Sequence, residues 1–335
     1  MNYFQLFNIS YMTNSVMSEL PYYGLSNTEL QKQLTNDRLS MMFDNNEFVD
    51  YLNNLNSSCL LKELNFQYVT EEQLTAKLKK LDRNIELSVF HMNIRSLNSK
   101  QRQICQLFEL LDYEFDVIIL TEIWTVNINF YANLFTGYDF YYDLPQDSKV
   151  GGVGLFIRNT CTVHELPQYQ ILSTRTSVVE NKWVEVTKES RKYIIGGIYR
   201  HPNQNIADFT SLLEPVLNSI SDQKLPCIIA GDINIDLTKS RVNENTSRYV
   251  DSLLTNNFLP TVLMPTRITP SSATLIDHMY YFDGCGSQNK VAQSGNLLAD
   301  ISDHLPNFML ILHDKMEPTK RPKIRIMSNK NREKI

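Results

Sequence analysis

The chain has 335 residues, of which 42% are hydrophobic and 21% charged, an ordinary composition for a globular protein of one large domain or two small ones. Its formal charge is −5, and because the stretch from Lys315 onward is mainly basic, the rest of the chain is acidic. This balance argues against nonspecific DNA binding, since contacts to phosphates need lysine and arginine. No run approaches the roughly 18 apolar residues that a membrane span needs.

The N-terminal residues and the cysteines both predict an intracellular protein. The first eight residues lack the basic stretch and the clean apolar core of a secretion signal. The cysteines are odd in number, widely scattered and without Cys-x-x-Cys spacing, which favours reduced, structural thiols. They are Cys59, Cys105, Cys161, Cys227 and Cys285.

Residues 1–84 predict a loosely ordered leader that ends in one amphipathic helix. Thr70-Glu-Glu-Gln73 fits a capping box that opens a helix over Glu71 to Leu81. We place a domain boundary near Asn84, assign residues 85–314 to the main domain and expect residues 315–335 to form a disordered basic tail.

From residue 85 onward, short apolar runs alternate with segments of helical periodicity. Strands are predicted at 85–91, 115–120, 153–157, 183–186, 193–199, 227–230, 278–282 and 306–312. Helices are predicted at 99–111, 206–220 and about 246–256, with Pro215 as a kink or break. Because the strands come partly in consecutive runs, we expect an α/β fold of two sheets packed face to face with outer helices.

Six short polar motifs follow or precede these strands, and their order is the main functional signal in the sequence. Open sheets place their chemistry at strand ends, so a carboxylate, an amide and an Asp-His pair can meet in one pocket there. Such a set can activate water against a phosphate ester. The motifs are His91-Met-Asn93-Ile-Arg95, Thr121-Glu122-Ile-Trp124, Ile198-Tyr199-Arg200-His201-Pro202, Gly231-Asp232-Ile-Asn234, Ile276-Asp277-His278 and Ser302-Asp303-His304.

Each motif alone also has a structural explanation. Asn93 and Asn234 could be turn residues, Tyr199 a core aromatic and Glu122 a helix cap. Glu122 is nevertheless the best magnesium ligand, because it ends an apolar strand where an unpaired charge is costly. Two classes of function therefore stay open: a divalent-metal phosphodiesterase, and a binding module whose polar strand ends are structural.

Other candidate motifs are assigned to packing. Gly151-Gly-Val-Gly154 leads into a strand and lacks the Lys-Ser/Thr of a phosphate loop, so we expect it to serve sheet packing. His164, His201 and His278 are expected at the surface or in packing. A serine hydrolase is disfavoured, because the chain lacks a Gly-x-Ser-x-Gly elbow.

In their order along the chain, the motifs resemble the endonuclease/exonuclease/phosphatase superfamily. The resemblance spans about residues 86–313 and implies a four-layered, DNase I-like α/β sandwich. It narrows to the endonuclease domain of non-LTR (LINE-type) retrotransposons, which resembles apurinic/apyrimidinic endonucleases and nicks DNA to prime reverse transcription. The segments that carry this narrower resemblance are His91–Leu97, Leu120–Trp124, Gly151–Phe156 and Gly197–Pro202.

The resemblance also implies a role for each motif residue. Glu122 would hold Mg²⁺, with Mn²⁺ as a substitute and with Asn93 as a further ligand or as an orienting residue, and Asp303 would complete this acidic metal site. Asp232 and Asn234 would align the attacking water, and the residue that takes its proton stays open. His304, oriented by Asp277, and Tyr199 would contact the scissile phosphate. Apart from the resemblance, Arg95 and Arg200 adjoin these motif residues, and we therefore expect them to be further phosphate contacts.

Partners and setting follow from the same resemblance. In such elements a reverse transcriptase follows the endonuclease, whereas this sequence stops at Ile335, so we expect that activity to be supplied elsewhere. A DNA target implies access to the nucleus, and we expect a monomer without a membrane partner. The alternatives are a phosphoesterase of the superfamily acting on lipid or inositol phosphates, and an inactive, transposon-derived binding module.

Overall fold

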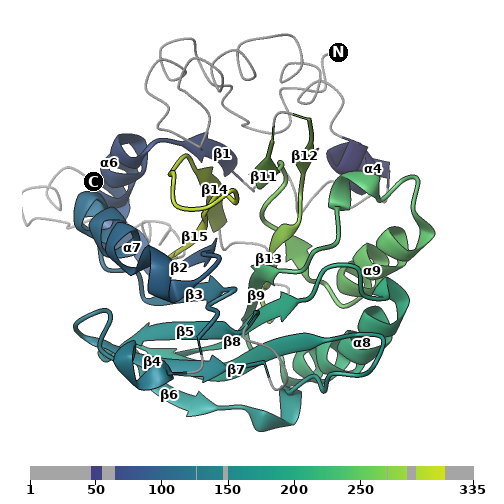
Figure 1. Ribbon diagram of the computed structural model, residues 1–335, viewed down its shortest axis with the longest axis horizontal. Helices are drawn as coiled ribbons and strands as arrows, with labels where there is room; N and C mark the ends of the chain where they lie inside the picture. Colours follow the sequence, from purple (N-terminus) through teal and green to yellow (C-terminus); the bar gives the residue numbers. More distant parts are fainter. Residues whose placement is uncertain are drawn as a thin grey trace, which may run out of the picture.

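The computed structural model describes residues 47–54, 65–125, 127–145, 150–269, 271–284 and 292–313 (Figure 1). Most of the predicted leader and the predicted basic tail lie outside the described residues. None of the described helices has the length and apolar character required to cross a membrane.

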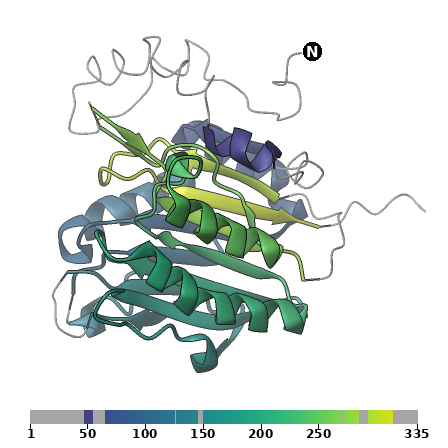
Figure 2. The same cartoon turned by 90° about the vertical axis from the view of Figure 1, so that its right-hand side faces the viewer.

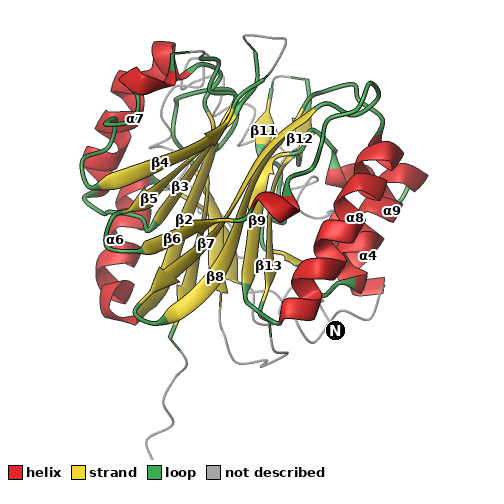
Figure 3. Cartoon of the chain, turned by 90° about the horizontal axis from the view of Figure 1, so that it is seen from below, coloured by secondary structure: helices red, strands yellow, loops and turns green. Residues whose placement is uncertain are grey.

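Two mixed sheets pack face to face in the middle of the molecule (Figure 3). In the first, the spatial order is β1 (Asn65–Val69), β14 (Ala292–Leu297), β15 (Asn307–Leu312), β2 (Ile85–Asn93), β3 (Val117–Thr121), β5 (Val153–Arg158) and β4 (Tyr138–Asp143). In the second, it is β10 (Leu259–Pro260), β13 (Asp277–Phe282), β9 (Cys227–Asp232), β8 (Arg191–Arg200), β7 (Val179–Lys188) and β6 (Thr162–Glu165). A small hairpin pairs β11 (Arg267–Ile268) with β12 (Ala273–Thr274).

Helices cover both outer faces, which makes the fold a four-layered α/β sandwich (Figures 2 and 3). On the side of the first sheet lie α6 (Glu71–Leu81) and α7 (Leu97–Leu111), and on the side of the second α8 (Ile206–Gln223), α9 (Glu244–Thr255) and the short α4 (Glu47–Asn54). Single 3₁₀ turns are η2 (Asp82–Asn84), η3 (Ile128–Phe130), η4 (Pro167–Tyr169) and η5 (Leu237–Lys239). The predicted fold class is confirmed.

The continuous apolar runs of the first sheet result from burial on both of its faces. In β3, Val117 and Ile119 belong to the core between the sheets, whereas Ile118 and Leu120 belong to the core under α6 and α7. Successive strand residues point to opposite faces, so a strand that is covered on both sides needs apolar residues at every position.

The predicted helices have nearly the expected bounds. Thr70 forms the predicted capping box, and α6 spans the predicted residues. Helix α7 begins two residues earlier than predicted, where the hydroxyl of Ser96 accepts a hydrogen bond from the Ser99 amide. Pro215 does not end α8, which continues to Gln223 because six of its side chains are buried and their packing outweighs the lost backbone bond.

Strand β1 was not expected, and it lies before the predicted boundary near Asn84. It pairs in parallel with β14 at one end of the first sheet, so this part of the chain contributes to the sandwich. The domain division itself stays a prediction. The other strands that were not expected are β4, β6, β10, β11, β12 and β14. Of these, β10, β11 and β12 have only two residues each, and β4 and β6 are edge strands whose exposed polar residues mask the alternation.

The strand registers bring the predicted motifs to one edge of the sandwich, here called the site edge. Strands β2, β3, β8 and β9 end there, and β13 and β15 begin there. Asn93 lies beside Thr121 in the first sheet, and Asp232 lies between Tyr199 and Asp277 in the second.

Candidate active site

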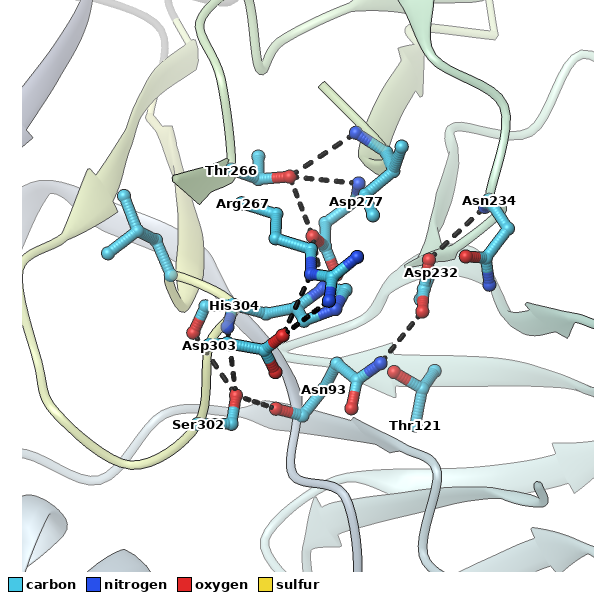
Figure 4. Close-up of polar contacts among 12 residues, drawn as sticks. Asn93, Thr121, Asp232, Asn234, Thr266, Arg267, Asp277, Ser302, Asp303 and His304 are labelled. Carbon is cyan, nitrogen blue, oxygen red and sulfur yellow. Dashed lines mark hydrogen bonds and ion pairs between the residues drawn. The ribbon is translucent and has the colours of Figure 1, made fainter. Parts of the chain in front are cut away.

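At the centre of the site edge, the side chain of Asn93 joins the carboxylates of Glu122 and Asp232, which follow or end strands of different sheets. Figure 4 shows its contact with Asp232. Its Nδ2 donates to Oε1 of Glu122 at 2.8 Å and to Oδ2 of Asp232 at 2.7 Å. Its Oδ1 accepts the backbone amide of Arg95 at 3.1 Å. As it is placed here, Asn93 orients both carboxylates through its nitrogen, which favours the role of an orienter over that of a metal ligand.

Asp232 is fully buried at the end of β9. Burial and the nearby carboxylate of Asp277 raise its pKa to about 7. Glu122 also raises this pKa, whereas the positive charge of His304 lowers it. Oδ1 of Asp232 accepts the backbone amide of Asn234 at 3.1 Å. Asp232 is thus held between an amide from each sheet and titrates near neutral pH.

The backbone is strained at three of the predicted site residues, one of which is Arg95 with φ 44°. Glu122 has φ 54° and Asn234 has φ 52°, in the left-handed region that non-glycine residues adopt rarely. Such conformations persist only where the surrounding structure holds them, and they cluster at functional sites. The Nδ2 of Asn234 is fixed by the carbonyl of Arg200 at 2.9 Å, so its side chain is also held in place.

His304 and Asp277 form a buried ion pair, with Nδ1 of the histidine 2.8 Å from Oδ2 of the aspartate. Burial alone would lower the pKa of His304, but Asp277 outweighs this and raises it to about 9. For Asp277 the effect of burial is likewise outweighed by His304, and its pKa lies below the ordinary value. At neutral pH the pair is therefore an imidazolium and a carboxylate.

Thr266 and Ser302 fix this pair at its two ends. The hydroxyl of Thr266 donates to Oδ2 of Asp277 at 2.6 Å and accepts its backbone amide at 3.0 Å. The hydroxyl of Ser302 donates to the carbonyl of Asn93 at 2.6 Å and accepts the amide of His304 at 3.1 Å. Sequence reasoning missed Thr266, because the apolar residues before it, Val262–Met264, lie in a loop and gave no predicted strand.

Asp303 does not take the role that was expected of it. Its Oδ1 lies 2.9 Å from Nη1 of Arg95, and its Oδ2 lies 2.7 Å from Nη2 and 2.8 Å from Nε of Arg267. Although burial acts in the opposite direction, these arginines and His304 lower its pKa to about 2. With one guanidinium on each oxygen, Asp303 holds two arginines at the rim and is not retained as a metal ligand.

Arg200 requires a second correction. It is 1% exposed, and its guanidinium donates to the backbone carbonyls of Ile233, Asn234 and Gln204. Because these donors are used inside the protein, Arg200 supports the loop after β9 and cannot serve as a surface phosphate contact. Arg95, by contrast, keeps 46% of its side chain exposed beside the site.

Tyr199 lies at the end of β8 and is almost fully buried. Burial and the carboxylates of Glu122, Asp232 and Glu180 raise its pKa well above the ordinary value, so its hydroxyl keeps its proton. Tyr199 therefore belongs to the same cluster as Glu122 and Asp232. Two other histidines agree with expectation: His164 is exposed, and His278 is buried in packing, with a pKa that burial lowers to about 4.

The acidic cluster suits a divalent cation. Among the described residues, Asp232, Asp277 and His304 bring possible ligand atoms within 4.8 Å of one another. A protonated His304 repels a cation, so we favour the oxygens of Glu122 and Asp232, the kind of ligand that Mg²⁺ prefers. Glu122 is only half-buried and can be reached from solvent. A cation there would also offset the close approach of carboxylates that raises the pKa of Asp232.

Residues 90–304 match the Endonuclease/Exonuclease/phosphatase family. The chain therefore belongs to this family, whose members are generally hydrolytic phosphoesterases. The resemblance predicted from the motif order is confirmed. No curated protein matches the sequence.

Solved structures show the same fold. A Bacteroides thetaiotaomicron protein of this family aligns with a TM-score of 0.52 at 14% identity, over 68% of this chain and 95% of its own. The mannosyl-6-phosphatase of the same bacterium aligns at 0.51 and 14% identity, over 68% and 100%. The endonuclease domain of TRAS1, a telomere-specific non-LTR retrotransposon, aligns at 0.50 and 15% identity, over 67% and 97%. The fold is DNase I-like.

Proposed function

We propose that the chain is a Mg²⁺-dependent endonuclease of LINE type that nicks one DNA strand by phosphodiester hydrolysis. The observation that carries the proposal is the cluster in which Asn93 joins Glu122 to Asp232, beside the imidazolium of His304. It combines a site for a hard cation, a carboxylate that titrates near neutral pH and a fixed positive charge.

Three residues perform the hydrolysis in this proposal. Asp232 accepts the proton of the attacking water, because it is the buried carboxylate next to Asn234, whose backbone amide it accepts. Asn234 orients that water, with its own side chain fixed by the carbonyl of Arg200. His304 remains protonated and stabilises the charge that develops on the phosphate oxygens.

The other residues of the site hold the substrate and the cation. Tyr199 keeps its proton and donates a hydrogen bond to a phosphate oxygen. Glu122 and Asp232 would hold Mg²⁺, which would supply Lewis acidity toward the phosphate and the attacking water. Asn93 keeps both carboxylates in position.

The rim of the site supports a nucleic-acid substrate. Arg95 and Arg267 share one carboxylate, that of Asp303, so this group of three carries a net charge of +1 and is partly exposed next to His304. Positive side chains placed there can contact the phosphates that flank the scissile one. The structurally similar TRAS1 domain is itself an endonuclease domain of a non-LTR retrotransposon, in agreement with the motif resemblance.

A panel of phosphoesters tests the proposal. We expect the purified protein with Mg²⁺ to cut one strand of a labelled DNA duplex and to leave sphingomyelin and an inositol phosphate intact. Preferred turnover of either small substrate would overturn the DNA assignment and retain the phosphoesterase. DNA binding without turnover of any substrate would indicate an inactive binding module.

The proposed setting follows from the proposed substrate. We propose that the enzyme acts on nuclear DNA, and that a reverse transcriptase supplied by another chain uses the 3′ end at the nick as its primer. We propose that the protein acts as a monomer, which size-exclusion chromatography with light scattering would test.

A further inference from the structure

Glu180 and His201 form a buried pair beside the site that the proposed reaction does not use. Glu180 lies in β7 and His201 directly follows β8. Nε2 of the histidine is 3.0 Å from both carboxylate oxygens of Glu180, and the side chains of His201 and Glu180 are 19% and 6% exposed respectively.

Both residues adjoin Tyr199. Glu180 is the direct cross-strand partner of Tyr199 in the β7–β8 register. The ring of His201 lies 4.9 Å from the ring of Tyr199, centroid to centroid, at an interplanar angle of 58°. His201 follows Tyr199 by two positions, so both side chains project on the same side of the chain.

The Glu180–His201 pair also supports the turn before β5, in the other sheet. Oε2 of Glu180 accepts the backbone amide of Gly152 at 3.3 Å. A Cβ atom at Gly151 would come within 2.9 Å of both Oε2 of Glu180 and Nε2 of His201, and Gly151 has φ +114°, which a side chain tolerates poorly. The turn can therefore lie directly on the pair only because this residue is glycine.

The same turn holds the loop that carries Glu122. The backbone amide of Trp124, two residues after Glu122, donates to the carbonyl of Gly151 at 3.0 Å. Contacts thus run from the Glu122 loop through the Gly151–Gly152 turn to Glu180 and His201, and from these to Tyr199. They connect the two sheets at the site edge.

We infer that Glu180 and His201 are positioning residues that hold the Tyr199 hydroxyl and the Glu122 loop in their reactive places. The inference rests on the proposed function, in which Tyr199 contacts the phosphate and Glu122 holds the cation. A displacement of about 1 Å at such groups can lower a rate on the order of 100-fold.

Two measurements on Glu180→Gln test the inference, with exposed His164→Gln in the neighbouring β6 as the control. The amide keeps an acceptor for Gly152 but removes the charge that faces His201. We expect kcat for nicking to fall about 10-fold or more with KM for DNA nearly unchanged, and the affinity for Mn²⁺, measured by electron paramagnetic resonance, to fall as well. His164→Gln should change neither value.

A double-mutant cycle with Tyr199→Phe separates positioning from a purely structural role. If Glu180 acts through the tyrosine hydroxyl, Glu180→Gln should lower kcat by a smaller factor in the Tyr199→Phe background than in the wild type. An equal loss of kcat in both backgrounds, together with unchanged Mn²⁺ affinity, would overturn the inference. Should the wild type fail to nick DNA while Glu180→Gln still weakens Mn²⁺ binding, the substrate would be wrong and the positioning role would stand.

Discussion

Nδ1 of His304 lies 2.8 Å from Oδ2 of Asp277, and neither side chain is more than 5% exposed. Because the aspartate is held by Thr266 and cannot turn toward solvent, it keeps the imidazole both oriented and protonated. A buried imidazolium next to a carboxylate that titrates near neutral pH gives the site a fixed positive charge and a proton acceptor at the same time.

The ion pair predicts how stability depends on pH in the presence of EDTA. The folded pKa of His304, about 9, is above the unfolded value of 6.5, so the contribution of the pair is complete below pH 6.5 and is lost as the pH rises through 9. The folded pKa of Asp277 is lowered, so the contribution is present above pH 3.8 and is lost on further acidification. The unfolding free energies of the wild type and His304→Gln should therefore differ most near pH 6.

Urea unfolding of both proteins at pH 6, 8 and 9.5 checks this dependence. The difference in unfolding free energy should shrink toward pH 9.5, by at most about 3 kcal/mol, since one pKa unit corresponds to about 1.4 kcal/mol. A difference that stays constant across this range would show that the imidazole is neutral in the folded protein.

Asp232→Asn should abolish hydrolysis without lowering stability. In the folded protein this carboxyl is buried beside Asp277, and the raised pKa of about 7 means that ionising it costs stability as the pH rises from 3.8 through 7. The neutral amide avoids that cost, so in EDTA at pH 8 the variant should melt no lower than the wild type. Asp139→Asn, at an exposed position in β4, is the matched control and should change neither property. A marked drop in melting temperature for Asp232→Asn would contradict the prediction.

Magnesium should stabilise the protein more at pH 8 than at pH 6. A cation binds ionised carboxylates, and Asp232 holds its proton until about pH 7. Binding to the folded state raises the melting temperature by mass action. Differential scanning fluorimetry at both pH values, with and without Mg²⁺, measures the effect. In Asp232→Asn the rise in melting temperature caused by Mg²⁺ should be the same at pH 6 and pH 8. If the rise is also equal at both pH values in the wild type, Asp232 is not a ligand of the cation.

Arg200→Met should destabilise the protein without weakening its binding to DNA. The substitution removes the buried guanidinium that bonds three backbone carbonyls, and we expect a loss of about 3 kcal/mol in unfolding free energy. The control Arg83→Met, at an exposed position in η2, should change the unfolding free energy little. The affinity of the folded variant for a fluorescent duplex, measured in EDTA at low temperature, should equal that of the wild type. A loss of affinity with unchanged stability would restore Arg200 as a phosphate contact.

Arg95→Gln should have the opposite effect. Arg95 is half-exposed at the rim, and Asp303 keeps Arg267 as a partner when Arg95 is removed. We expect unchanged stability and weaker DNA binding, with the slope of log K against log salt reduced by about 0.9, because the variant neutralises one phosphate fewer. Arg83→Gln provides the control. An unchanged salt slope would show that Arg95 does not contact the backbone of DNA.

Much of the site could be predicted from the sequence, because its residues adjoin apolar runs that are recognisable as strands. Asp232 follows one such run and His304 precedes another, so their meeting at one edge follows from the fold class. Thr266 follows the apolar residues Val262–Met264, but these lie in a loop and were not predicted as a strand. Its role depends on a loop that returns to Asp277, which only tertiary structure shows.

Arg200 shows where sequence adjacency misleads. It follows Tyr199 in β8, and this proximity suggested a shared phosphate-binding role. Successive residues of a strand point to opposite faces, however, so Arg200 is directed away from Tyr199 and into the interior. His201, two positions after the tyrosine, returns to its side and packs against its ring.

Strand β1 escaped prediction for a different reason. Its five residues, Asn65–Val69, stand in a polar, asparagine-rich region without a long alternating pattern. The strand forms because β14, more than 200 positions later, offers an edge with which it pairs in parallel. Local sequence carries little information about such a distant partner.

Relaxation of supercoiled plasmid is the most direct test of the proposed activity. Wild type, Asp232→Asn and Asp139→Asn would be incubated with plasmid in Mg²⁺ and in EDTA, after their folding has been verified by circular dichroism. Nicked circles should form with Mg²⁺ for wild type and Asp139→Asn, and should form neither in EDTA nor with Asp232→Asn. Absence of nicking by the folded wild type, or equal nicking by Asp232→Asn, would contradict a DNA endonuclease centred on this carboxylate.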